Sequence, residues 1–563
     1  MRSGAAALRS DGATMAQETL ATTSKGTGNQ AATASPWAPL RLPVFRALWT
    51  ATVVSNIGTW MHDVGAAWLM MSLSPSPLMV SLVQAATTLP MFLFALPAGV
   101  LADIVDRRRL LLFAQIWMLV AAALLGGLQV MGLVTPPILL LFTFALGFGA
   151  ALNAPPFQAI VSELVPKGEL PAAVALNSLG INIARAIGPA VGGGVVAALG
   201  PAAVFILNAV SVLGVLIVLL RWRREPRAGT LPPERFFGAV RAGFRFVREV
   251  PAIQTVLVRA GAFFLFASAT WALLPLVARQ ELGLSAGGYG ILLAFIGAGA
   301  VLGALMLPRV RGKVSANGIV AGATVLFAAV ALALAYLRNV PLLCAVMILA
   351  GVGWIAMLST LNVAAQMALP NWVKARVLAV YLVVFNGGMA MGSTLWGTMA
   401  SRFGVPLALI VAATGLVLAL ILVHRRRLPD EVGNLTPSLH WPTPVVAQDP
   451  DLERGPVLIT VEYQVPPNQA AEFVLAMEEM RHMRRRDGAF SWGLFEDTAR
   501  PGCWLETFEV ETWVEHLRQH ERVTQADREV QERVNTFHTG ADGPTVTHLL
   551  APDRDALRKD AQP

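Results

Sequence analysis

The sequence predicts an all-α polytopic membrane bundle of twelve transmembrane helices in two six-helix halves, followed by a small α+β domain. Three observations predict this fold class. Only 14% of the 563 residues are charged, whereas soluble chains average about 25%. Long apolar runs recur between residues 45 and 423. After residue 427 the pattern of a soluble protein returns, so the mean hydropathy of +0.59 averages two different regions.

Composition also excludes several classes of protein. Residues 1–40 are rich in small and polar residues and lack an apolar stretch, so we expect a disordered tail and no cleaved signal peptide. The net charge of +8 comes from short basic clusters between apolar runs, so we expect no nucleic-acid partner. The two cysteines, Cys344 and Cys503, exclude a disulfide framework and a CxxC metal site.

Twelve apolar runs are each long enough to cross a bilayer, which requires about 20 residues per helix. They predict a first half at 41–220 and a second half at 251–428. The runs are separated by Pro, Gly or charged residues. Their approximate centres are Ile57, Leu89, Leu119, Phe144, Asn182, Val212, Ala267, Phe295, Val325, Leu349, Phe385 and Leu416.

Basic residues predict the orientation, because cytoplasmic loops hold the excess of Lys and Arg. One set of alternate loops is basic, and the other offers only Arg279, Arg338 and Arg402. We therefore expect a multi-pass protein of the cytoplasmic membrane with both termini in the cytoplasm. The basic loops contain Arg107, Arg108, Arg109, Lys167, Arg221 to Arg248, Arg309, Arg311, Lys313, Lys374 and Arg376.

A basic linker at 221–250 joins the two halves and contains an amphipathic stretch, 235–247, expected to lie on the inner membrane surface. Six helices, a linker and six helices indicate duplication. One register recurs, because the spacing in the fifth helix matches that in the eleventh. The matching residues are Pro166, Asn182, Gly188 and Gly193 with Pro370, Asn386, Gly392 and Gly397.

A polar stripe in the first helix is a candidate transport pathway. Asn56, Thr59, Trp60 and Asp63 follow helical spacing within an apolar segment and should face the bundle interior. Asp63 is a candidate for proton uptake or substrate binding, since removal from water favours a neutral carboxyl group. The alternative is a structural aspartate bonded to a neighbouring helix. With no GxxxxGK[ST] phosphate loop, a gradient-driven carrier is the simpler interpretation.

The fifth helix carries a second stripe with Ser178, Asn182, Arg185 and Pro189. An arginine at this depth requires a partner, for which Asp63 and an anionic substrate are candidates. Alternatively, Arg185 binds a backbone carbonyl or snorkels to the surface. Other polar residues in the spans are candidate ligands or interhelical hydrogen-bonding groups. They are Gln84, Asn362, Gln366 and Asn386.

The segment between the second and third helices, 99–109, resembles the cytoplasmic loop signature of the major facilitator superfamily. The resemblance implies a conformational gate, in which Gly99 permits close helix approach and Asp103 with Arg107 and Arg108 forms a charge latch between the halves. Ile104 and Asp106 depart from that pattern, which puts the strength of the latch in doubt.

The fifth helix resembles the glycine-proline signature of exporters in that superfamily, which adds four residues to the expected gate: Gly188, Pro189, Gly192 and Gly193. The alternative is a packing face of small residues. Thr143 stands where proton antiporters usually carry an arginine. The stretch from Asn153 to Arg185 resembles the transmembrane secretion effector branch, which includes siderophore exporters. This resemblance implies alternating-access export of a small molecule, such as a siderophore, antibiotic or metabolite, with protons as the expected coupling ion.

The region after the bundle is predicted to contain a linker at 429–454, a cytoplasmic domain at 455–552 and a tail at 553–563. Strands are expected at 457–465, 490–496, 504–510 and 545–550, with a helix at 469–486 and two short helical stretches before the last strand. This order resembles a ferredoxin-like module of the antibiotic biosynthesis monooxygenase type. That group implies homodimerisation and includes both enzymes and ligand-binding proteins.

An alternative function follows from this C-terminal module, namely a membrane-tethered monooxygenase-like enzyme or ligand sensor. Fold alone does not carry over activity, so we expect a transporter without a cofactor. His516 and His520 have the spacing of metal ligands but lack a third, so we expect a solvated helix face and no metal site. Trp492 and Trp504 are expected in the core.

Overall fold

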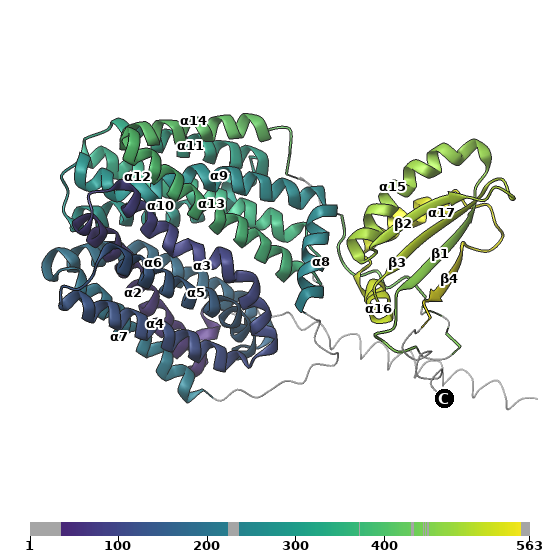
Figure 1. Ribbon diagram of the computed structural model, residues 1–563, viewed down its shortest axis with the longest axis horizontal. Coiled ribbons are helices and arrows are strands. Elements are labelled where there is room, and N and C mark those ends of the chain that lie inside the picture. Colours follow the sequence, from purple (N-terminus) through teal and green to yellow (C-terminus); the bar gives the residue numbers. More distant parts are fainter. Residues whose placement is uncertain are drawn as a thin grey trace, which may run out of the picture.

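The computed structural model describes residues 35–222, 236–370, 372–428, 433–442, 444, 446–447 and 450–552. A large helical bundle and a small α+β domain lie at the two ends of the molecule, with helix α8 between them (Figure 1). The expected tails lie mostly outside the described residues. Residues Ala38–Arg41 are an exception, because they form a short 3₁₀ helix, η1.

Six long helices form the first half of the bundle in the described part of the chain. Most begin at a proline in the first turn, where its missing N–H loses no hydrogen bond. The helices are α2 (Pro43–Leu73), α3 (Pro77–Ile104), α4 (Arg107–Val130), α5 (Pro136–Leu164), α6 (Leu170–Leu199) and α7 (Pro201–Arg221).

Six further long helices form the second half, and α8 (Phe236–Glu249) precedes them along the chain. The helix α9 ends in a short π-helical segment, η3 (Val277–Glu281). All twelve predicted helix centres fall within observed helices. The second-half helices are α9 (Pro251–Leu276), α10 (Ala286–Arg311), α11 (Ala316–Tyr336), α12 (Val340–Met367), α13 (Lys374–Phe403) and α14 (Val405–Val423).

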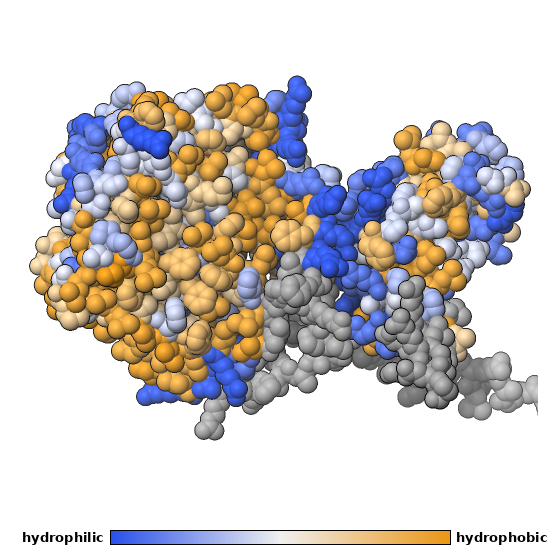
Figure 2. Space-filling view, in the orientation of Figure 1, coloured by the Kyte–Doolittle hydropathy of each residue, from blue (hydrophilic) through white to orange (hydrophobic). Residues whose placement is uncertain are grey.

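Eleven helices in the described ranges are long and apolar enough to cross a membrane. The remaining bundle helix, α2, is 31 residues long but contains the polar stripe, which lowers its hydropathy. It packs against α6 and α7 within the first half. Hydrophobic residues cover the bundle surface in Figure 2, as expected for contact with lipid.

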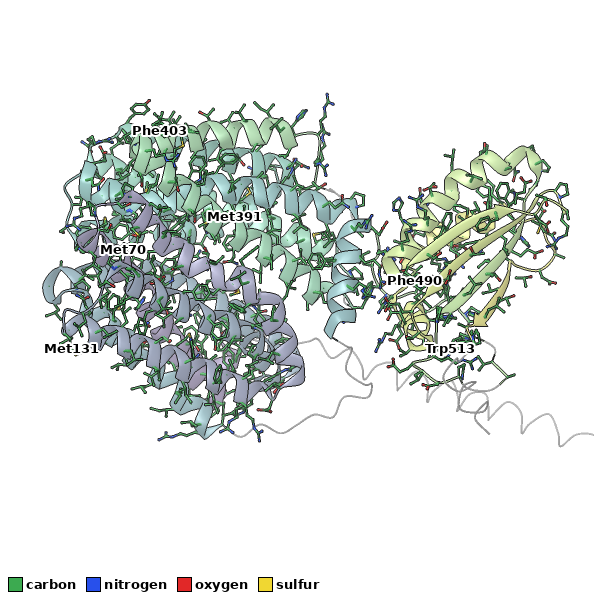
Figure 3. All side chains as sticks on the ribbon, viewed as in Figure 1. Met70, Met131, Met391, Phe403, Phe490 and Trp513 are labelled. Carbon is green, nitrogen blue, oxygen red and sulfur yellow. The ribbon has the colours of Figure 1, made fainter. Side chains whose placement is uncertain are left out.

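The two ends of the bundle are distinguished by their neighbours. Met131, after α4, and Phe403, at the end of α13, lie at the end farthest from the α+β domain (Figure 3). We call this end the far side, and the end next to α8 the domain side. Helices α2, α4 and α6 run from the domain side to the far side, and α3, α5 and α7 run back.

The α+β domain contains a four-stranded antiparallel sheet with the strand order β2-β3-β1-β4. Val457 pairs with both Val510 and Leu550, which fixes the register of the central strand. This order and the sequence of elements fit a β-α-β-β-α-β arrangement. The elements are β1 (Val457–Gln464), α15 (Ala470–Asp487), β2 (Ser491–Glu496), β3 (Cys503–Val510), α16 (Trp513–Arg522), α17 (Gln525–Asn535) and β4 (Thr545–Leu550).

One face of the sheet forms the core of the α+β domain. Alternate β1 residues from Val457 to Tyr463 are buried against Phe473 and Met477 of α15, as expected for a period of two. Trp492 and Trp504 pack at the edge of this core and are partly buried. Figure 2 shows a hydrophilic band where the bundle meets the domain, in contrast to the lipid-facing surface.

Candidate functional site

A cavity of about 760 Å³ lies inside the first half of the bundle. Helices α2 to α7 all contribute to its wall. Its residues on α2 run from Trp49 to Asp63, and those on α6 from Leu170 to Ile181, so the cavity occupies the domain-side part of this half. A volume of this size can enclose a drug-sized molecule.

The stripe on α2 contributes Asn56, Thr59 and Asp63 to the cavity wall. No ion pair to Asp63 is present among the described residues, although Tyr289 of α10 lies within reach of its charge. Tyr289 also stacks on Trp68, with 6.5 Å between the ring centroids. The carboxyl group therefore lies in the first half but close to a residue of the second.

Arg185 does not pair with Asp63, which corrects one of the two counter-ions suggested by the sequence. Its guanidinium carbon lies 5.7 Å from the ring centroid of Trp60, and its Nε has no hydrogen-bond partner. The favourable contact is thus a cation–π interaction within the first half. The spacing of residues along α2 and α6 does not show which side chains meet, so the sequence could not predict that Trp60 would contact Arg185. Arg185 does not line the cavity.

Two asparagines at matching positions of the two halves are held by their own helices. Asn182 Nδ2 donates to the Ser178 carbonyl, and Asn386 Nδ2 donates to the Leu382 carbonyl, both at 2.9 Å. Gln366 donates to Asn362 on the same helix face. These residues and Gln84 lie outside the wall of the cavity, so their expected place in the pathway stays a prediction.

Several polar residues of the cavity wall were not proposed as site residues from the sequence. Among them, Gln115 of α4 donates to Asn153 of α5 at 3.0 Å, and Asn208 of α7 and Thr52 of α2 also line the cavity. Each of the amides stands alone in its apolar run, so helical periodicity gave no signal. His62 of α2 is also buried, lines the cavity and contacts the ring of Phe205.

The two halves meet closely on the far side. The Leu78 amide of α3 donates to Ser401 Oγ of α13 at 2.9 Å. Arg279 of η3 donates to Ser72 of α2 at 3.2 Å and lies over the ring of Trp68. These hydrogen bonds join the halves at the end opposite the cavity.

Comparison with protein families identifies the family to which this architecture belongs. Residues 34–556 match the family model described as transmembrane secretion effector, which covers the bundle and the α+β domain. The chain belongs to the transmembrane secretion effector family. It is therefore a multi-pass membrane transporter of the major facilitator type, as the sequence motifs indicated.

Relatives and solved structures agree with this assignment. The transporter is 28% identical over 384 residues to the enterobactin exporter of Salmonella paratyphi A, covering 67% of this chain and 90% of the relative. It is also 28% identical to that of Escherichia coli O1:K1 / APEC, covering 70% and 96%. A bacterial homologue of the human lysosomal transporter Spinster has the same fold (TM-score 0.56, 18% identity, 70% and 99% covered). So does the nucleoside transporter NupG (0.52, 11%, 68% and 99%).

The superfamily loop of this secretion effector binds within its own half. Arg107 Nη1 lies 2.7 Å from Glu163 Oε1 of α5, and Arg108 donates to the Leu219 and Leu220 carbonyls at the end of α7. These contacts do not cross to the second half. The side chain of Asp103 lies outside the described part, and Gly99 has open space around it, so the expected charge latch stays a prediction.

The glycine-proline segment of the secretion effector lies at two helix contacts. A methyl group on Gly188 would lie 2.6 Å from Trp60 Cβ, and one on Gly192 would lie 2.7 Å from Met61 Cα, both on α2. A methyl group on Gly193 would meet the carbonyl oxygen of Ala286 on α10. Pro189 is buried in the same stretch. These positions thus allow α6 to pack closely against α2 of its own half and α10 of the other half. Such contacts also fit a packing face of small residues, so the expected gate stays a prediction.

The histidines of the α+β domain correct another expectation. His516 is not on a solvated face, because it is buried and packs against His520 and His548. The ring nitrogens of His516 and His520 are 3.3 Å apart. Burial arises because α16 turns this face toward β4. In the described part of the chain, no three His, Cys, Asp or Glu residues are grouped for a metal ion.

Proposed function

We propose that this transporter exports a small molecule from the cytoplasm by alternating access, driven by protons. The observation that carries the proposal is the polar cavity on the domain side, to which the described residues contribute a single carboxylate, together with the closed far side. A cavity reached from one side and sealed at the other is one of the two states that alternating access requires. The relatives named as enterobactin exporters support a secreted molecule, such as a siderophore, antibiotic or metabolite.

The orientation that we propose puts the domain side in the cytoplasm. An excess of basic residues at the domain-side ends of the helices supports this. The far side carries Arg279, Arg338 and Arg402, whereas the domain side carries Arg107, Arg108, Arg109, Arg309, Arg311, Lys374 and Arg376. The N-terminus of α2 and the α+β domain are then both cytoplasmic. A fluorescent protein that folds only in the cytoplasm, fused after residue 563, should therefore fluoresce.

Asp63 is proposed as the proton-binding group. Its support is its position in a cavity wall with no ion pair among the described residues, which leaves the carboxylate free to exchange a proton with water. Four polar residues remain weaker candidates for the pathway, because they lie in the spans of the bundle but outside the cavity wall. They are Asn182, Asn386, Gln84 and Gln366.

Metabolite profiling of the culture medium tests this function. Cells that express the chain should release at least one compound that cells without it retain, and a protonophore should stop the release. The Asp63→Asn variant should be present in the membrane at normal levels but inactive. Release that persists in the Asp63→Asn variant, or after the proton gradient is collapsed, would contradict proton coupling through this residue.

For the α+β domain we propose an accessory role instead of an oxygenase activity. A buried charge supports this, because the Glu506 carboxylate accepts hydrogen bonds from Arg484, Trp492 and Tyr463 and so belongs to the core of the domain. Deletion of residues 455–552 should then leave a measurable rate of export. Oxygen consumption by the full chain with a quinol would favour the enzymatic alternative.

The open face of the sheet supports a second proposal, that two chains pair through this domain. Phe495 and Leu549 are 57% and 49% exposed there, beside the partly exposed Leu458 and Leu505. An exposed apolar face of this kind favours association. The full chain in detergent should have the mass of a dimer, and Phe495→Lys should make it monomeric. A monomeric wild-type chain would contradict the pairing.

A further inference from the structure

The wall of the cavity has an unusual charge composition. Asp63 is its single acidic residue, and no lysine or arginine lines it among the described residues. The rest of its polar surface comes from amides, hydroxyl groups and one imidazole. The amide residues are Asn56, Gln115, Asn153, Gln158, Asn177 and Asn208. The fixed charge of this wall is therefore negative or zero, according to whether Asp63 holds a proton.

Several buried polar atoms in the wall have no hydrogen-bond partner. They include Gln115 Oε1, Asn208 Oδ1 and both ring nitrogens of His62, and these three side chains are only 3–4% exposed. A buried polar atom without a partner costs about 1–3 kcal/mol. The two amide oxygens can only accept hydrogen bonds. A ligand that donates hydrogen bonds would therefore supply the partners that these oxygens lack in the protein.

The apolar part of the wall requires a second property of the ligand. Trp49, Phe157, Val161 and Met118 line the cavity beside the polar groups. A lipid chain could contact these residues but could not satisfy the amide oxygens or Asp63. A small inorganic cation could bind Asp63. It would leave most of the 760 Å³ cavity empty and the apolar residues of the wall without a contact. An amphipathic organic molecule meets both requirements.

We propose that the cargo of this transporter is an amphipathic organic cation, whose positively charged N–H group pairs with Asp63 inside the first half of the bundle. Its other N–H groups donate to the oxygens of Gln115 and Asn208. The aromatic or aliphatic body lies against Trp49 and Phe157. This inference rests on the proposed function and narrows its cargo to one chemical class.

A simple exchange follows from a single carboxylate. Asp63 can balance either one proton or one ammonium group, because the described wall offers no second acid. The site is neutral while Asp63 holds its proton. When the cation binds, this proton leaves to water and an N–H···O contact with the carboxylate replaces it, so the site stays neutral. The cargo would then leave when a proton arriving from the far side takes its place.

Binding of two related dyes to the full chain in detergent tests this proposal. Rhodamine 6G and fluorescein share a xanthene body but differ in charge, since the first is a cation and the second an anion at pH 7.5. We expect the fluorescence anisotropy of rhodamine 6G to report binding at least 10-fold tighter than that of fluorescein. Asp63→Asn should weaken rhodamine 6G binding about 10-fold or more, because it removes an ionic hydrogen bond.

Three further variants separate the cavity from general effects. Gln115→Leu and Asn208→Leu should each weaken rhodamine 6G binding several-fold, and Ala150→Phe should abolish it by filling the cavity that Ala150 lines. Glu281→Gln is the matched control, because it also neutralises a carboxylate of the bundle but lies in an ion pair with Arg338 outside the cavity. Its affinity should equal that of the wild type.

The outcomes distinguish the cargo class from the proposed function. Fluorescein binding as tight as rhodamine 6G, no binding of either dye, or unchanged affinity in Asp63→Asn would each overturn the cation proposal. If export into the medium then still requires Asp63 and the proton gradient, the proposed transport function holds although the proposed cargo class does not. Loss of export with intact rhodamine 6G binding would instead overturn the function and keep the site.

Discussion

Arg522 of α16 lies over the ring of Trp372, with its guanidinium carbon 4.6 Å from the ring centroid. Trp372 belongs to the loop before α13, and its ring also packs against Phe246 of α8 at 5.8 Å. Arg522 is fixed from the other side by Glu515 at 2.6 Å. This contact therefore links the α+β domain to the second half of the bundle.

We expect Trp372→Ala to loosen the domain from the bundle. The variant removes both the cation–π contact with Arg522 and the packing against Phe246, each worth on the order of 1 kcal/mol. Hydrogen exchange of α8 in the full chain should become faster, while exchange within the sheet should not. Trp37→Ala, which removes a tryptophan that is 56% exposed near the N-terminus, is the control and should change neither.

Charged contacts of α8 should make the docking sensitive to salt. Arg245 pairs with Glu515 at 3.4 Å and donates to the Gly488 carbonyl, whereas Arg241 pairs with Glu511 at a more exposed site. Exposed pairs contribute less than about 1 kcal/mol, and salt screens them. Arg245→Ala should therefore speed exchange in α8 more than Arg241→Ala does. Equal effects of the two variants would contradict this ranking. Docking that is unchanged in 1 M salt (roughly a 3 Å screening length) would contradict the expected salt sensitivity.

The sequence was sufficient to predict elements that depend on local patterns. Apolar runs broken by proline and charge located the bundle helices, and alternation located strands such as Thr545–Leu550. Contacts between helices could not be predicted in this way. The stripe rule placed Asp63 and Arg185 toward the interior but could not show that Trp60 would take the arginine. Gln115 and Asn208 belong to separate helices, so only the fold brings them to one cavity.

The buried ion pair of the α+β domain should be essential for its stability. Glu506 is fully buried and lies 3.0 Å from Arg484 Nε, so Glu506→Gln leaves a buried arginine without its counter-charge. Loss of one partner of such a pair costs about 3–5 kcal/mol. Urea-dependent hydrogen exchange of β3 in the full chain should show this loss. Glu462→Gln, in the exposed pair with Arg500, should cost less than about 1 kcal/mol.

Acid should destabilise the same domain through its histidines. Burial, followed by the charges of neighbouring histidines, lowers the pKa of His516 from 6.5 to about 3 and that of His520 to about 4. Below pH 6.5 the unfolded chain binds protons that the folded domain excludes. Stability should therefore be full above pH 6.5 and fall toward pH 4, by up to about 1.4 kcal/mol per pH unit for His516 and by less for His520, which solvent screens because it is only partly buried.

Hydrogen exchange of α16 and β3, corrected for the intrinsic rate at each pH, measures this slope. His516→Gln should flatten it, because the amide does not titrate. His482→Gln is the matched control in the same domain, since the side chain of His482 is 53% exposed. A slope that is equally steep in His516→Gln and the wild type would exclude His516 as its source.

Substitution of two adjacent glycines of α6 should have different effects on the far-side closure. A methyl group on Gly193 would lie 2.6 Å from the Ala286 carbonyl oxygen and 3.0 Å from Gly290 Cα, whereas one on Gly194 would meet only open space. Backbone atoms cannot move aside as a flexible side chain can. Gly193→Ala should therefore push α6 from α10 and favour the state in which the far side is open.

Labelling of a buried far-side cysteine can detect that opening. Ser81 of α3 is fully buried against α13, so Ser81→Cys, in a chain with Cys344 and Cys503 changed to serine, should react slowly with an impermeant maleimide. Gly193→Ala should raise the labelling rate several-fold. Gly194→Ala should leave the rate unchanged and raise stability by up to about 1 kcal/mol, because alanine favours a helix over glycine. Equal labelling rates in the two glycine variants would mean that the contact with Ala286 does not hold the halves together.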